Sequence, residues 1–101
     1  MGAMRNDLER AREAFEARDW DDAVRGLALA DAQGALPPDD LRRLAVSSFL
    51  TGRDRAAEEA WSRAHDGYLN DGDVEAAARA AFWLGMVLVT GREEHARGGG
   101  W

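Results

Sequence analysis

The sequence contains no cysteine, which excludes disulfide frameworks, thiolate zinc sites and cysteine nucleophiles. It contains no lysine either, so all 13 basic residues are arginine, and 19 acidic residues bring the formal net charge to −6. Because a phosphate backbone requires clustered positive charge, this balance disfavours nucleic acid as a direct partner. The longest apolar run, residues 80–89, is about half the roughly 20 residues of a transmembrane helix, so we expect no membrane contact.

Proline occurs only at Pro37 and Pro38, and no alternating strand pattern competes with the alanine, leucine, arginine and glutamate that dominate the chain. This composition predicts an all-α fold. The length of 101 residues fits a single small domain, which we place at residues 4–101, with residues 1–3 set aside as an expression scar. The N-terminus lacks the apolar segment of a signal peptide, so we expect a cytoplasmic protein.

Helix-start and helix-stop residues predict antiparallel hairpins at about residues 6–34, 39–69 and 73–101. Asn6, Asp19 and Asp73 are the expected N-caps, since their side chains can accept hydrogen bonds from free amides of the first turn. Gly91 is expected to end the fifth helix, which leaves a short sixth helix that includes Trp101. We therefore predict a stack of five to six helices.

An internal repeat supports this division, because five apolar pairs share a separation of 34 residues. The pairs are Ala11 and Ala45, Phe15 and Phe49, Ala23 and Ala57, Leu27 and Trp61, and Ala30 and Ala64. All lie on the predicted inner faces, where a recurring helical hairpin buries its apolar side chains. A third copy follows at a separation of 39 residues, with Thr51-Gly52-Arg53 recurring as Thr90-Gly91-Arg92.

The repeat resembles the tetratricopeptide repeat (TPR), a 34-residue hairpin whose second helix carries alanine, a bulky residue four positions on and alanine three further on. Ala23-Leu27-Ala30 and Ala57-Trp61-Ala64 follow that pattern. The aromatic-Leu-Gly element of the first helix survives only as Trp83-Leu84-Gly85, and the terminal proline is missing. The resemblance implies a short TPR-like superhelix that binds other proteins.

A narrower resemblance rests on the segment AFWLGMVLVTGREEHARGGGW after an acidic, glycine-containing linker. It is similar to the N-terminal repeat region of the large LuxR-type transcriptional regulators of high-G+C bacteria, whose DNA-binding domain is C-terminal. The absence of lysine and isoleucine beside 20 alanines agrees with a high-G+C genome. This resemblance implies a protein-interaction or regulatory module, and the alternative is a helical domain of such a regulator that senses a small ligand.

Residue patterns for catalysis or metal binding are weak, so we expect no enzyme, no cofactor and no metal site. The acidic pairs, such as Asp21-Asp22 and Asp39-Asp40, lie at predicted helix starts or on polar faces, where caps and solvated charges are expected. Aligning Gly72 with the glycine of a calcium loop leaves glycine, leucine and alanine at ligand positions. His65 and His95 lack zinc spacing, and Ser47-Ser48 lies within a predicted helix.

Two sets of residues remain as candidate binding surfaces. In TPR-like stacks the first helix of each hairpin lines a concave groove, so the resemblance places Arg12, Arg42 and Val46 there, where the arginines would bind carboxylates. The second set comes from residues 80–89, which are apolar on every side of the predicted helix. We expect some of Phe82, Trp83, Met86 and Val87 to form an exposed association face, most simply in a homodimer, unless a folded-back sixth helix covers it.

Overall fold

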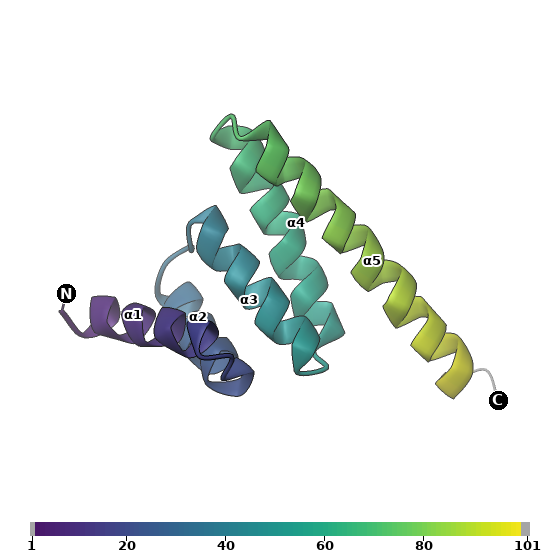
Figure 1. The fold of residues 1–101 in the computed structure, drawn as a ribbon, viewed down its shortest axis with the longest axis horizontal. Coiled ribbons are helices and arrows are strands. Elements are labelled where there is room, and N and C mark those ends of the chain that lie inside the picture. Colours follow the sequence, from purple (N-terminus) through teal and green to yellow (C-terminus); the bar gives the residue numbers. More distant parts are fainter. Residues whose placement is uncertain (1, 100–101) are drawn as a thin grey trace.

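The computed structural model of the protein describes the backbone of residues 2–99 and the side chains of residues 7–90. Over this range the chain forms five α-helices and no strand, which confirms the predicted all-α class. The helices are α1 (Gly2–Glu16), α2 (Trp20–Gln33), α3 (Pro38–Leu50), α4 (Asp54–Asn70) and α5 (Val74–Gly99). Consecutive helices run antiparallel, so α1 and α2 form one hairpin, α3 and α4 form a second, and α5 packs along α4 (Figure 1).

Two helix boundaries differ from the sequence prediction. Asn6, the predicted N-cap, lies inside α1, which begins at Gly2. Gly91 lies inside α5, a single helix of 26 residues where we predicted a fifth helix and a short sixth. A glycine costs about 1 kcal/mol in a helix interior, and the good helix formers that follow in REEHAR outweigh one such residue. Trp101, expected to complete the third hairpin, lies outside the described residues.

The turns between helices follow the local sequence signals. The side chain of Asp19 accepts a hydrogen bond from the Asp22 amide, and that of Asp73 accepts one from the Ala76 amide at 3.1 Å, so both predicted caps are confirmed. Gly52 and Gly72 adopt φ values of 80° and 79°, a left-handed conformation that favours glycine. These two positions therefore allow the sharp reversals after α3 and α4.

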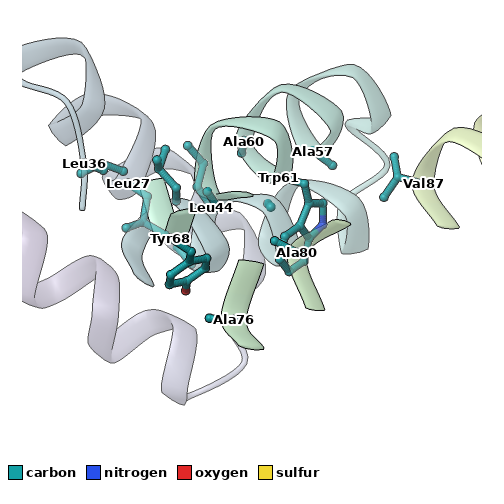
Figure 2. Close-up of a cluster of buried hydrophobic side chains, with 14 of the residues drawn as sticks. Leu27, Leu36, Leu44, Ala57, Ala60, Trp61, Tyr68, Ala76, Ala80 and Val87 are labelled. Carbon is teal, nitrogen blue, oxygen red and sulfur yellow. The ribbon is translucent and has the colours of Figure 1, made fainter. Parts of the chain in front are cut away.

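The core lies along the contacts of α2, α3 and α4 and extends onto the first half of α5 (Figure 2). All ten residues of the 34-residue repeat belong to this core or pack against it as half-buried side chains. Leu27 of α2 and Trp61 of α4 occupy matching positions, and both are buried. The burial predicted from the repeat is thus confirmed at every pair.

Small residues set how closely the helices approach. A Cβ atom at Gly26 of α2 would lie 2.7 Å from the Cβ atom of Ala11 in α1, closer than two such atoms can come. A Cβ atom at Gly67 of α4 would lie 2.6 Å from Cγ of Pro38 at the start of α3. Close crossings of this kind leave no gap between helices and maintain native packing density.

Candidate functional site

A groove with a volume of about 710 Å³ lies between α3 and α5, with α4 as its floor. From α3 it is lined by Asp39, Arg42, Val46, Phe49 and Leu50. On the other side it is lined by Asp73, which precedes α5, and by Ala76, Arg79, Ala80, Trp83, Met86, Val87 and Thr90 of α5. The floor carries Trp61 and Tyr68, seven residues apart on one side of α4.

The helical spacing of the sequence produces this lining. On α3 the groove residues from Asp39 to Phe49 follow one another at intervals of three or four, which places them on one side of the helix, and Leu50 lies next to Phe49. Residues 39–50 of α3 span about 18 Å at 1.5 Å per residue, enough for three helical turns of a bound peptide. Figure 2 shows Trp61 beside Ala80 and Tyr68 beside Ala76, so the α4 floor meets α5 along this length.

One end of the groove is polar. The Tyr68 hydroxyl donates a 2.7 Å hydrogen bond to Oδ1 of Asp39. Burial, followed by this bond and the charge of Asp39, raises the pKa of Tyr68 to about 12, so the hydroxyl keeps its proton at neutral pH. The Asp73 side chain also has a hydrogen-bond partner, because it accepts a bond from the Ala76 amide at the start of α5. Both carboxylates at this end therefore already have partners within the protein.

The two arginines of the groove, Arg42 and Arg79, lack side-chain partners of opposite charge in the described structure. Neither Arg42 nor Arg79 forms an ion pair with any side chain among residues 7–90. The guanidinium carbon of Arg42 lies 6.0 Å from the ring centroid of Phe15, at the outer limit of a cation–π contact. Arg42 also lies beside the Tyr68 hydroxyl, where its charge partly offsets the raised pKa of that group. The groove thus offers two guanidinium groups without carboxylate partners in the described structure, beside its apolar floor.

The other end of the groove is apolar. It is lined by Phe49 and Leu50 of α3 and by Trp83, Met86 and Val87 of α5. Leu50, Trp83 and Met86 are exposed, so this end presents large apolar surface to solvent. Apolar lining with a few placed polar groups is the usual composition of a binding site in proteins.

The three residues predicted to line the groove do not lie together in the structure. Arg42 and Val46 line the groove as the resemblance implied, but Arg12 does not. Two nitrogens of the Arg12 guanidinium donate hydrogen bonds to Asp40 of α3. Nε lies 2.9 Å from Oδ1, and one terminal nitrogen lies 2.6 Å from Oδ2. Arg12 therefore joins the two hairpins instead of facing the groove.

The four residues predicted as one association face also lie on different sides of α5. Val87 is buried in the core, which corrects its assignment to an exposed patch. Trp83 and Met86 belong to the groove, and Phe82 is exposed outside it. The predicted exposure is confirmed for Phe82, Trp83 and Met86, whereas a single shared face is not observed.

Sequence reasoning missed the buried acidic residues that join the hairpins. Asp40 is only 1% exposed and also accepts a 2.9 Å hydrogen bond from Arg43, which corrects its assignment to solvated surface. Burial alone would raise the pKa of Asp40, but the hydrogen bond and charge of Arg12, followed by those of Arg43, lower it. Asp31 of α2 accepts two 2.8 Å bonds from Arg63 of α4, and this pairing lowers its pKa. No sequence signal indicates these pairs, because their partners lie 28 and 32 residues apart and share no common spacing.

The other candidate sites can now be placed. Within the described residues no three acidic or histidine side chains gather in a way that could hold a metal ion. Nδ1 of His65 lies 2.8 Å from the Ala77 carbonyl oxygen, a contact between α4 and α5, while the side chain of His95 lies outside the described set. Ser47 and Ser48 are fully buried in α3, and neither hydroxyl has a hydrogen-bond partner in the described structure.

No family model, curated protein or solved structure matches the chain. A separate search of the described residues finds no helix that is both long enough and apolar enough to cross a membrane.

Proposed function

We propose that this domain is a protein-interaction module whose groove between α3 and α5 binds a peptide segment of a partner protein. The observation that carries the proposal is the groove itself, an apolar channel over Trp61 that has two arginines without ion-pair partners in the described structure. Its chemistry favours a segment with bulky apolar side chains and a carboxylate. The apolar side chains would lie against Trp83 and Met86, and the carboxylate would lie between Arg42 and Arg79.

The two groove arginines, and not the overall charge, support this choice of occupant. The protein as a whole is acidic, with a net charge of −6, so long-range attraction does not draw an acidic peptide to it. Recognition of a carboxylate must therefore come from local pairing. Asp39 and Asp73 accept bonds from the Tyr68 hydroxyl and the Ala76 amide and keep their negative charge, so Arg42 and Arg79 are the groove residues that can bind an anionic partner.

The proposal is tested by selecting peptides from a random library displayed on phage and measuring their affinity for the purified chain by fluorescence polarisation. We expect enriched peptides to combine acidic and large apolar residues. Val46→Glu, in the middle of the groove wall, should abolish binding. Arg42→Gln and Arg79→Gln should each weaken binding about tenfold, the usual loss for a charge-assisted hydrogen bond.

Arg55→Gln is the matched control, because Arg55 is exposed on α4 and does not line the groove. This variant should bind selected peptides like the wild type. Thermal melting must show that all four variants fold. Failure to enrich any peptide, or equal binding by Val46→Glu and wild type, would contradict the proposal.

A second candidate function is sensing of a small ligand, and the groove volume is the observation that favours it. About 710 Å³ falls within the range of roughly 300–1,000 Å³ typical of small-molecule sites. The two functions are distinguished by screening a metabolite collection for compounds that raise the melting temperature. A compound that stabilises the wild type but not Val46→Glu would favour sensing.

We further propose that the module belongs to a LuxR-type transcriptional regulator in the cytoplasm and has no catalytic role. The support is the resemblance of residues 81–101 and the two hairpins with their buried 34-residue register. The test is the reading frame of the source gene downstream of the codon for Trp101. A helix-turn-helix domain encoded there would support the proposal, and a stop codon at that point would contradict it.

A further inference from the structure

The side of α5 that points away from both the core and the groove forms a continuous apolar strip, which we call the outer face. It consists of Ala78, Ala81, Phe82, Gly85, Leu88 and Val89. All six residues are exposed in the described structure, and Phe82 and Val89 are exposed by 61% and 60%. Ala78, Phe82, Gly85 and Val89 follow one another at intervals of four, three and four residues, so they lie in one row along the helix.

We infer that the outer face of α5 is a self-association surface on which a second copy of this chain packs about a two-fold axis. This inference concerns a surface separate from the groove and does not rest on the proposed peptide binding. Three observations favour a second copy as the occupant, namely the charge of the face, its shape and its area.

The charge pattern suits contact between identical chains. About a two-fold axis the same face meets itself, so a face that carried charges of one sign would repel its copy, whereas an uncharged face does not. Charged residues make up 32% of the chain, but residues 80–91 include no charged residue. The net charge of −6 would oppose association through most of the surface, and the outer face is where the opposition is weakest.

The shape of the face also suits a two-fold contact. A Cβ atom built at Gly85 would meet no other atom within 4 Å, so α5 is open there to the close approach of another helix. If two α5 helices cross in antiparallel orientation at Gly85, Phe82 of one copy lies beside Leu88 of the second copy. Ala81 then lies beside Val89 of the second copy, so that small residues face large ones.

The exposed area agrees with a weak dimer. An aromatic side chain buries about 150–250 Å² when fully covered, so Phe82 alone offers roughly 120 Å². With Leu88, Val89 and the small residues, the face presents roughly 400–500 Å² per copy, which is the size of the largest apolar patch on a typical monomer, a patch that is often functional. Two copies would bury roughly 800–1,000 Å², below the roughly 1,200–2,000 Å² of stable interfaces and in the range of weak, transient ones, so we expect dissociation constants in the micromolar range or weaker.

The experiment is sedimentation velocity of the full chain over a series of micromolar concentrations. The wild type should reach twice the 11.1 kDa mass of one chain as concentration rises. Val89→Glu should raise the dissociation constant at least about a hundredfold, because each dimer would contain the buried carboxylate twice. Leu29→Glu is the control, since Leu29 is similarly exposed at 58% and belongs to α2, whereas α5 packs along α4 (Figure 1).

A cross-linking experiment tests the position of the axis. The chain has no cysteine, so Gly85→Cys introduces its only thiol, at a position with room for the side chain. A disulfide between two copies requires Cα atoms about 4.4–6.8 Å apart, which only a crossing near Gly85 provides. Mild oxidation should cross-link Gly85→Cys at least about tenfold faster than Leu29→Cys at the same concentration.

Three results would overturn the inference. One is a wild-type chain that stays monomeric over the whole concentration range, and another is equal association of Val89→Glu and wild type. The third is a monomer whose outer face binds vesicles of phosphatidylcholine in a flotation assay and loses that binding in Val89→Glu, which would assign the face to a lipid surface. Val46→Glu, in the groove, should dimerise like the wild type, which separates this result from the peptide-binding experiment.

Discussion

Replacing Asp40 with asparagine removes a charge that joins the two hairpins. The carboxylate lies on α3, is 1% exposed and accepts three hydrogen bonds, two from Arg12 of α1 and one from Arg43. Asparagine has nearly the same volume but offers one acceptor oxygen in place of two. Its amide nitrogen, a donor, would face the guanidinium donors. The substitution therefore leaves the packing intact and breaks the ion pairs.

The expected loss in the free energy of unfolding depends on how deeply each partner of the ion pair is buried. Removing one member of a buried ion pair typically costs about 3–5 kcal/mol, because the remaining charge is left without compensation. The side chain of Arg12 is 41% exposed, so water can solvate it after the change. We therefore expect a smaller loss, about 2–3 kcal/mol in the free energy of unfolding. For a domain of this size that corresponds to a decrease of roughly 10–20 °C in melting temperature.

Urea unfolding followed by circular dichroism measures this loss directly, and Asp21→Asn is the matched control. Asp21 faces Arg53 at 3.7 Å, but its side chain is 68% exposed, so its replacement should change stability by less than about 0.5 kcal/mol. Equal effects of the two substitutions would refute the reasoning, because burial would then not determine the strength of the ion pair.

The pH dependence gives an independent check. The folded-state pKa of Asp40 lies below its ordinary value of 3.8, so the ion pairs contribute their full stability above that value. The contribution is lost as the pH falls through the lower folded-state pKa. The difference in stability between wild type and Asp40→Asn should therefore be constant from neutral pH down to about pH 5 and should shrink below pH 4. A difference that grew on acidification would have the wrong sign.

Other substitutions test the packing, each by urea unfolding. Trp61→Ala should cost about 3–5 kcal/mol, since the indole is buried between α3, α4 and α5, and a change below 1 kcal/mol would place Trp61 at the surface. Ser48→Ala should be neutral or stabilising by up to about 1 kcal/mol, because the buried hydroxyl has no partner in the described structure. Gly67→Ala should destabilise through its contact with Pro38, whereas Gly85→Ala, tested in a monomeric Val89→Glu background, should stabilise by about 0.5–1 kcal/mol. A change of the same sign at both glycines would contradict the helix crossings described above.

The helices and the core were predictable because local signals and the repeat agree. The caps at Asp19 and Asp73, the turn at Gly52 and the buried repeat positions all follow from spacing in the sequence. The end of α5 was not predictable in this way. At Gly91 a single unfavourable residue competes with favourable helix formers on both sides, and the sum over the whole segment decides the outcome.

The ion pairs between hairpins could not be predicted, because they depend on how one hairpin is placed on the next. Asp39 and Asp40 are adjacent in the sequence, yet one is exposed at the mouth of the groove and the other is buried. Near the start of a helix both are equally favourable, since both interact well with the helix dipole. Only the position of α1, which brings Arg12 beside α3, distinguishes the two residues.

The same dependence on neighbouring helices explains α5. Its sequence shows that residues 80–89 are apolar on all sides, and a helix of this kind needs contacts on more than one side. The position of α4 buries the side that carries Ala80 and Val87, and the position of α3 turns the side of Trp83 and Met86 into a groove wall. The remaining side, with Phe82, is exposed, and the Phe82 ring meets that of Trp83 edge to face at 5.3 Å. A single apolar run thus has three separate environments, which is why a partner for the groove and a second copy on the outer face can be tested independently.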